Sequence, residues 1–246
     1  MEGRTLQATI DIRRAGERFV TATDWLDSRH SFSFNRHYDP KNTHFGLLLV
    51  SNDDVVRPGT GFSTHPHQDM EIVTWVLDGT LEHQDSEGHA GEIYPGLAQR
   101  MSAGTGIWHS EMNATRDGDV HFVQMWVVPD EQRIRPGYQQ LEIESELARG
   151  GLVPLASGRG IDAAISIRQK HATLWVGRLQ PGEAVTTPAA PFVHLYVAVG
   201  DVDLEGAGRL GRGDAARISF HDGLRLTAGS RGAEVLVWEM HATIAA

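Results

Sequence analysis

The chain has 246 residues, no cysteine and a formal net charge of -10 at pH 7 with histidine neutral. The acidic balance disfavours direct binding to nucleic acid, because it repels phosphate backbones, and the lack of cysteine excludes disulfides, thiolate metal sites and cysteine nucleophiles. The 27 glycines and the thinly spread aromatic residues favour short strands joined by tight turns over a helical bundle.

The beginning of the chain shows no targeting signal. Residues 1–19 lack the apolar core of a signal peptide, and no apolar run approaches the roughly 20 residues that a membrane span needs. We therefore expect a cytoplasmic protein without a membrane partner.

The first predicted elements are short. Residues 5–22 mix apolar and charged positions without a helical face, which predicts short strands. Residues 24–40 contain alternating Phe32 and Phe34 and a turn signal at Asp39–Pro40. Three histidines in or just after this segment have no partner at a metal-like spacing, so we predict structural or surface roles for His30, His37 and His44.

The sequence FGLLLVSNDDVV follows at residues 45–56. Its apolar beginning predicts a buried strand, and the polar residues 51–54 are predicted to end that strand in a turn. Gly59 and Gly61 come next and permit a sharp bend of the backbone.

Two motifs with histidine are the most informative feature of the chain. β-forming apolar residues close to the HPH sequence indicate strand structure. Side chains two apart on a strand point to the same face, so His65 and His67 are aimed at one point. His109 and Glu111 repeat this geometry. If the two strands lie side by side, three imidazoles and one carboxylate surround a single cation.

This ligand set leaves alternatives open. Imidazole and carboxylate suit divalent iron, nickel, copper and zinc, and four protein ligands on a six-coordinate ion leave two positions for substrate and dioxygen. A closed tetrahedral zinc site with a structural role is the competing outcome. Glu71, four residues after His67, is the main rival ligand.

Neighbours of the two motifs are weaker candidates for the pocket. Trp108 either shapes the pocket wall or packs in the core, and packing is favoured. Glu82 and His83 either line the interior or belong to a structural turn, and the turn is favoured. Gln124 faces either the pocket or an interior hydrogen-bond network, and the sequence does not choose between them.

Strand patterns continue through the rest of the chain. Residues 120–129 predict a strand with Gln124 and Trp126 on one face. Residues 130–160 combine prolines, charges and glycines, which predicts a connection between two halves, with a short helix near 143–149. Further strands are predicted for the sequences ATLWVGRL, FVHLYVAVG, AARISF and RGAEVLVWEM.

The second half repeats the pattern of the first. The strand that ends at Gly79 aligns with one that ends at Gly200, and the segment that begins at Gly96 aligns with one that begins at Gly213. In this alignment none of the four proposed ligands has a metal-binding counterpart. The equivalent residues are Thr186, Pro188, Leu226 and Ala228.

Long segments of the first half resemble the pirin family, a bicupin branch of the cupin superfamily that includes bacterial quercetin 2,3-dioxygenase-like proteins. The resemblance rests on DWLDSRHSFSF, FGLLLVSNDDVV, GTGFSTHPHQDMEIVTWVLDGTLEHQDS, QRMSAGTGIWHSEMN and VHFVQMWVVP, which cover most of residues 24–129. It implies an all-β bicupin fold with two jelly-roll-type β-barrels in one chain. Residues 1–135 would form an N-terminal cupin domain with the metal site, and residues 136–246 a C-terminal cupin domain without metal ligands.

The resemblance implies the same four metal ligands that strand geometry selects, namely His65, His67, His109 and Glu111. The pirin group takes its carboxylate from the HxE motif, so Glu71 is expected to be structural. The expected cofactor is one divalent metal ion, with Fe2+ ranked first and Ni2+, Mn2+, Co2+, Cu2+ and Zn2+ as alternatives. No other cofactor-binding residue is expected.

The resemblance also implies a reaction, the oxygenation of a flavonol of the quercetin type or of another enolate or phenolate. Three neutral histidines, one glutamate and a divalent ion sum to about +1, which attracts an anionic oxygen donor, and Glu111 would take the proton of the substrate hydroxyl. The partners are then a small aromatic substrate and O2. The alternatives are a non-enzymatic, metal-dependent regulator that acts through protein–protein contacts, and a bicupin with another small substrate.

Overall fold

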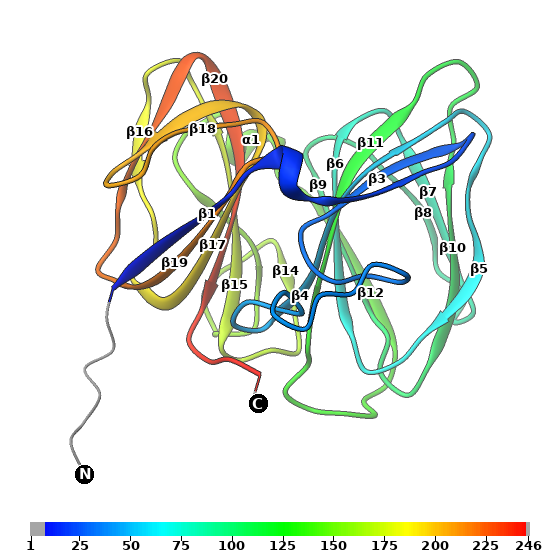
Figure 1. The fold of residues 1–246 in the computed structure, drawn as a ribbon. Coiled ribbons are helices and arrows are strands. Elements are labelled where there is room, and N and C mark those ends of the chain that lie inside the picture. Colours follow the sequence, from blue (N-terminus) through cyan, green and yellow to red (C-terminus); the bar gives the residue numbers. More distant parts are fainter. Residues whose placement is uncertain (1–7, 245–246) are drawn as a thin grey trace.

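The computed structural model describes residues 8–244, and these residues form strands almost throughout (Figure 1). The predicted all-β bicupin fold is confirmed. Of the short strands predicted for residues 5–22, residues 5–7 lie outside the described residues. Two strands fall in the remainder, β1 (Thr9–Arg13) and β2 (Phe19–Ala22), separated by a short 3-10 helix, η1 (Ala15–Glu17).

The first barrel has two walls. The larger wall is a seven-stranded sheet in the order β12-β9-β6-β11-β4-β3-β2. Its other strands are β3 (Leu26–His30), β4 (Leu48–Val56), β6 (Glu71–Asp78), β9 (Leu97–Ser102), β11 (Val120–Val127) and β12 (Gly137–Glu142). The smaller wall is a four-stranded sheet in the order β5-β10-β7-β8. It comprises β5 (Gly61–His67), β7 (Leu81–Asp85), β8 (Ala90–Ile93) and β10 (Ile107–Asn113).

The second barrel is a single nine-stranded sheet, with β1 at one end of its strand order. Its long strands β17 (Ala190–Leu204) and β20 (Arg225–Met240) pair along most of their length and contain bulges, which help a sheet to bend. The remaining strands are β13 (Val153–Ser157), β14 (Ile165–Ser166), β15 (Ala172–Leu179), β16 (Ala184–Thr186), β18 (Gly208–Gly211) and β19 (Ala215–His221). The predicted short helix is confirmed as α1 (Glu144–Leu147).

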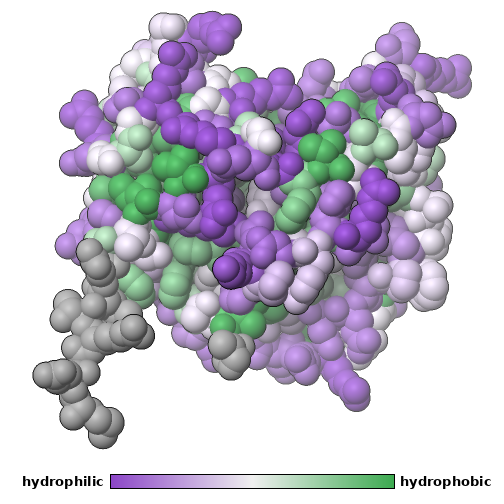
Figure 2. Space-filling model, in the orientation of Figure 1, coloured by the Kyte–Doolittle hydropathy of each residue, from purple (hydrophilic) through white to green (hydrophobic). Residues whose placement is uncertain are grey.

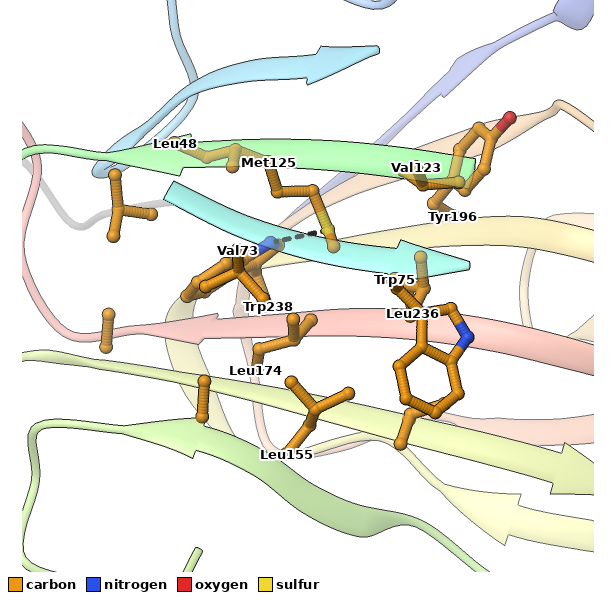
Figure 3. Close-up of a cluster of buried hydrophobic side chains, with 14 of the residues drawn as sticks. Leu48, Val73, Trp75, Val123, Met125, Leu155, Leu174, Tyr196, Leu236 and Trp238 are labelled. Atoms are coloured by element: carbon orange, nitrogen blue, oxygen red, sulfur yellow. Dashed lines mark hydrogen bonds between the residues drawn. The ribbon is translucent and has the colours of Figure 1, made fainter. Parts of the chain in front are cut away.

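The largest apolar cluster lies between the barrels (Figure 3). Alternate residues of β6 and β11 in the first barrel, such as Val73 and Met125, face β15, β17 and β20 of the second. Trp238 donates its indole N–H to the Met125 sulfur at 3.3 Å, and Trp75 donates to the Glu234 carboxylate at 2.6 Å. Burial of such large apolar surfaces is the dominant stabilising contribution in folding, so the two barrels pack as one body.

The interior of the second barrel is filled by aliphatic side chains. Leu226 and Ala228, which align with the HxE motif of the first half, are both buried in this cluster. In the described part of the chain, both side-chain groups with the geometry to hold a metal ion lie in the first barrel.

Two predictions about the strands were wrong. Residues 51–54 do not form a turn, because β4 continues through them to Val56 and all four are buried. Residues 130–160 are more than a connection, because they include β12, which pairs with β9, and β13, which pairs with β15.

Strand pairing crosses the predicted domain division at residues 135 and 136 in both directions. β1 pairs with β19 of the second barrel, and β12 pairs with β9 of the first. The division itself stays a prediction.

One face of the molecule is mostly hydrophilic, with small separate hydrophobic patches (Figure 2). Among residues 8–244, no helix combines the length and the apolar character that a membrane crossing requires.

Candidate metal centre

Two neighbouring strands of the smaller wall bring the predicted ligands together. β5 and β10 are antiparallel, and His65 lies directly opposite His109. The ring centroids are 4.4 Å apart for His65 and His109, 4.8 Å for His65 and His67, and 4.9 Å for His67 and His109. The predicted convergence of three imidazoles is therefore present in the structure.

The Glu111 carboxylate does not fall in the same group of candidate ligand atoms as the three histidines. Candidate ligand atoms of His65, His67 and His109 all lie within 4.8 Å of one another, and a second such group contains His83, His109 and Glu111. His109 belongs to both groups. A register shift between His109 and Glu111 marks a bulge at this point of the strand pair.

The histidine nitrogens have the properties that a cation needs. Nε2 of His67 and Nε2 of His109 are buried without a hydrogen-bond partner among the described residues. Burial lowers the pKa of His67 to about 4 and that of His109 to about 3. Both rings are therefore neutral at physiological pH, and a neutral imidazole offers a lone pair to a metal. The residues present fit a divalent ion.

Hydrogen bonds on the opposite ring nitrogens orient two of these histidines. His65 Nδ1 lies 2.8 Å from the carbonyl oxygen of Ser63, to which it donates, so its Nε2 carries the lone pair. His109 Nδ1 lies 3.4 Å from His83 Nδ1, and His83 Nε2 lies 3.3 Å from the Asp85 carboxylate. We assign the tautomers in which His83 donates to Asp85 and accepts from His109, which leaves Nε2 of His109 free for an ion.

Glu111 is held by a short chain of side chains on β11. The amide nitrogen of Gln124 donates to both carboxylate oxygens, at 2.9 and 2.8 Å. The amide oxygen of Gln124 accepts from the indole N–H of Trp126 at 3.0 Å. Trp126 also meets the edge of the His67 ring, with centroids 4.8 Å apart. Gln124 therefore faces the site, a question that the sequence left open.

A cavity of about 360 Å³ opens beside the histidines. This volume falls in the range of sites for small organic molecules. Its walls combine aromatic side chains with a few polar groups from the larger sheet. The lining includes Trp25, Phe34, Phe62, Trp126, Asn52, Asp54, His65, His67 and Glu111.

Asp54 is a cavity residue that sequence reasoning missed. Its carboxyl group is buried, and its Oδ1 has no hydrogen-bond partner among residues 8–244. Burial raises the pKa of Asp54 to about 7. The signal in the sequence was the alternation of Asn52, Asp54 and Val56, which places these residues on one face of a strand.

His83 is a second residue whose role was predicted wrongly. It lies in strand β7 rather than in a turn, is completely buried, and stacks on Tyr138 with centroids 4.8 Å apart. Trp108 was also predicted wrongly, since it is 54% exposed and packs neither in the core nor in the cavity wall.

Other predictions near the site are confirmed. Glu71 is structural, since its carboxylate accepts from the Ser102 hydroxyl at 2.9 Å and from the backbone N–H of Arg168 at 3.0 Å. His30 is a buried structural residue, with its ring nitrogens 2.9 Å from the Thr21 hydroxyl and 2.9 Å from the Asn52 amide oxygen. It also forms part of the cavity wall.

Comparisons with known proteins agree with this geometry. Residues 12–127 match the family model described as Pirin, and residues 154–240 match that described as Quercetinase C-terminal cupin domain. A Mycobacterium tuberculosis protein named "Putative quercetin 2,3-dioxygenase" is 60% identical over 240 residues, which are 97% of this chain and 98% of that protein. Quercetin 2,3-dioxygenase of Escherichia coli K12 is 38% identical over 232 residues, which are 94% and 98% of the two chains.

The solved structures lead to the same group. The structure of YhhW from Escherichia coli matches with a TM-score of 0.88 and 36% identity, over 97% of this chain and all of that one. A structure described as bacterial pirin YhhW in complex with nickel(II) matches with a TM-score of 0.87 and 36% identity, over 96% of this chain and all of that one.

Proposed function

The chain belongs to the pirin family, and from this membership we propose that it is a metal-dependent dioxygenase acting on a flavonol of the quercetin type. The proposed metal ligands are His65, His67, His109 and Glu111. The observation that carries the proposal is the pair of buried, unpartnered Nε2 atoms of His67 and His109 beside a cavity of about 360 Å³. The relatives named quercetin 2,3-dioxygenase supply the substrate class.

Each side chain in the site has a task in this reaction. A bound divalent ion would lower the pKa of a substrate hydroxyl and provide redox or Lewis-acid chemistry. Glu111 takes the hydroxyl proton, and Gln124 holds the Glu111 carboxylate in position for this transfer. Phe34, Phe62 and Trp126 line the cavity with the aromatic surface that a planar ring system packs against.

Asp54 provides a second place for a proton in the same cavity. A carboxyl group with a pKa near 7 is matched to proton transfer at neutral pH. We therefore assign Asp54 to hold or release a proton in the cavity that Glu111 also lines. Asp54→Asn is expected to lower kcat while metal content stays unchanged.

The proposal is tested by the oxygen-dependent loss of quercetin absorbance with purified, metal-loaded protein. His65→Ala is expected to lose both bound metal and turnover. His44→Ala serves as the matched control, because His44 lies in a loop outside the cavity lining and its Nδ1 contacts the hydroxyl of Thr43. Turnover that survives in His65→Ala would contradict the proposed metal centre.

A metal-loaded protein that binds its ion but never consumes quercetin or other flavonols would instead support a non-enzymatic regulatory role. Elemental analysis of protein purified without added metal identifies the resident ion. We expect iron first, and the nickel complex of the relative makes nickel the first alternative. Stoichiometric zinc would weigh against redox chemistry.

A further inference from the structure

A second cavity, of about 200 Å³, lies where the two halves of the chain meet. The segment from β1 through η1 to β2 crosses from the second barrel to the first (Figure 1) and forms one wall, and β17 and β19 contribute to another. Arginines outnumber acidic residues among its charged side chains, which are Arg13, Arg14, Arg18, Arg217, Glu17 and Asp39. Arg13, Arg14 and Arg18 each have a carboxylate within 4.0 Å, on Asp11, Asp214 and Asp53 respectively. Among residues 8–244, Arg217 is therefore the lining arginine that lacks such a partner.

Arg217 is the central charge of this cavity. It is 6% exposed, and its guanidinium donates to the backbone oxygen of Ser31 at 3.2 Å and to the amide oxygen of Asn42 at 2.6 Å, both neutral acceptors. Asp11 lies opposite Arg217 in the sheet but pairs with Arg13 at 2.9 Å. Within residues 8–244, no carboxylate oxygen lies within 4.0 Å of the Arg217 guanidinium.

The guanidinium carbon of Arg217 lies 4.6 Å from the centre of the Phe32 ring and 5.9 Å from that of Phe45. These rings and the two neutral acceptors offset only part of the desolvation cost of a buried cation that has no counter-charge. Burial and the nearby Arg13 lower the pKa of Arg217 to about 10, so the guanidinium remains charged at neutral pH. The missing partner is therefore an anion rather than a lost proton.

Unpartnered polar atoms concentrate at the same place. Nine buried side-chain polar atoms have no hydrogen-bond partner among the described residues, and four of them belong to residues that line this cavity. These four are Arg18 Nε, Ser31 Oγ, His194 Nε2 and Arg217 Nε. Two others are the Nε2 atoms of His67 and His109. The metal centre thus presents lone pairs that suit a cation. The second cavity presents N–H donors of Arg18 and Arg217 and the O–H donor of Ser31, which suit an anion.

We propose that this cavity binds a small oxyanion, either inorganic phosphate or a small carboxylate, between Arg18 and Arg217. A guanidinium group offers a planar fork of N–H donors that matches both kinds of oxyanion. The volume holds several water-sized groups but is smaller than the roughly 300 Å³ at which sites for drug-sized molecules begin.

The cavity owes part of its space to Ala215. This residue lies opposite Arg13 on β1 and opposite Tyr196 on β17, in the row of side chains next to that of Arg217. A larger side chain at this position would occupy the cavity without removing any charge, which separates the effect of space from that of charge.

The experiment measures phosphate and malonate binding to the full chain by calorimetry and by thermal unfolding, with chloride at matched ionic strength as the reference. We expect a saturable rise in melting temperature with one of the two oxyanions and none with chloride, because a ligand of the native state stabilises it. The two arms distinguish phosphate from carboxylate. The rise should persist in His65→Ala protein, which places the anion away from the metal centre.

Two variants locate the site. Arg217→Met should weaken oxyanion binding by about tenfold or more, since hydrogen bonds to charged groups are each worth about 1.5–3 kcal/mol. Arg149→Met, at an exposed arginine beyond α1, is the matched control and should bind as the original chain does. Ala215→Val should also weaken binding while Arg217 remains in place, which keeps the test valid if Arg217→Met fails to fold.

The proposal is overturned if neither phosphate nor malonate raises the melting temperature more than chloride does. That result would mean that the cavity holds water only. Binding that is undiminished in folded Arg217→Met or Ala215→Val protein would overturn it equally, because the anion would then lie elsewhere.

Discussion

Two histidines of the metal centre, His65 and His109, have a hydrogen-bond partner that fixes which of their nitrogens faces the cavity. His109 is the clearest case, because Asp85 and His83 form a chain that ends at its Nδ1. Such partners raise the basicity of a ligand and hold its ring in place. The metal affinity of this site is therefore distributed over residues that do not touch the ion.

The first prediction concerns His83. His83→Phe retains a ring to stack on Tyr138 but removes the acceptor for His109 Nδ1–H. We expect metal affinity to fall by about 10- to 100-fold, the usual cost of losing such a partner, measured by competition with a chromophoric chelator. His44→Ala should retain full affinity. An unchanged affinity in folded His83→Phe protein would refute the tautomers assigned here.

A second prediction follows from His194. This side chain is buried, and burial together with Arg217 lowers its pKa to about 3 in the folded protein. The unfolded chain takes up a proton near pH 6.5, so the stabilising contribution of neutral His194 is complete above that pH and is lost as the pH falls toward 3. At pH 5, protonation of this group in the unfolded chain lowers the free energy of unfolding by about 2 kcal/mol.

The measurement is the free energy of unfolding from denaturant titrations at pH 7.5 and pH 5. The side chain in the His194→Leu variant cannot titrate. Between pH 7.5 and pH 5, the free energy of unfolding of this variant should therefore fall by about 2 kcal/mol less than that of the original chain. Equal losses in the two proteins would show that His194 is protonated or solvated in the native state.

Residue types and spacing were sufficient to predict that His65, His67 and His109 lie together, because an HxH and an HxE on strands restrict where side chains point. The assignment of these histidines and Glu111 as one set of metal ligands stays a prediction. The partners of these residues were not predictable. His83 lies on β7, directly opposite Glu111 on the paired strand β10, and Gln124 lies on β11 in the facing sheet. The sequence did not show which strands would pair or which would face each other, so these partners could not be identified from spacing.

At the scale of the strands, the site depends on the close approach of β5 and β10. Gly61 begins β5 opposite Met112, and a methyl group on Gly61 would overlap the carbonyl oxygen of Glu111 and the Cα of Met112. The absence of a side chain at this position allows the two ligand-bearing strands to pair.

We therefore predict that Gly61→Ala forces β5 away from β10. Overpacking of this kind typically costs about 1–3 kcal/mol, and metal affinity should fall along with stability. Thermal unfolding and a metal titration measure the two effects. Gly211→Ala is the control, since a methyl group there meets no atom within 4 Å, and it should change neither quantity. Normal metal binding by Gly61→Ala would show that the strand pair tolerates the methyl group.

Strand β4 shows why part of the fold escaped prediction. Its polar stretch suggested a turn, yet Asn52 and Asp54 line the cavity, while Asp53 accepts hydrogen bonds from His121 and Tyr196. A strand with a functional cavity on one face and a polar interface on the other has the composition of a loop. The strands with ordinary alternation, such as β11, were predicted correctly.

The whole molecule is organised around the interface between its barrels. Trp75, Val123 and Met125 of the first barrel and Leu236 and Trp238 of the second belong to one buried cluster (Figure 3). Neither barrel could expose this surface without a large loss of hydrophobic stabilisation. The division at residue 135 therefore need not correspond to two units that unfold independently.

We predict a single cooperative unfolding transition for the two barrels. Leu236→Ala should lower the free energy of unfolding by about 2–5 kcal/mol and should do so equally for both barrels. Hydrogen exchange followed by mass spectrometry tests this, with peptides from β9 in the first barrel and β15 in the second losing protection together. Loss of protection in the second barrel alone would show that the barrels are separate units.

The crossing of β1 and β12 has a consequence for the newly made chain. Thr9–Arg13 is synthesised before every strand of the first barrel, yet its partner β19 is synthesised after all of them. The edge of β1 therefore stays unpaired while the whole first barrel is translated. Docking of β1 onto β19 then closes a loop of the polypeptide that contains the first barrel, so a product that stops before β19 leaves β1 without its partner.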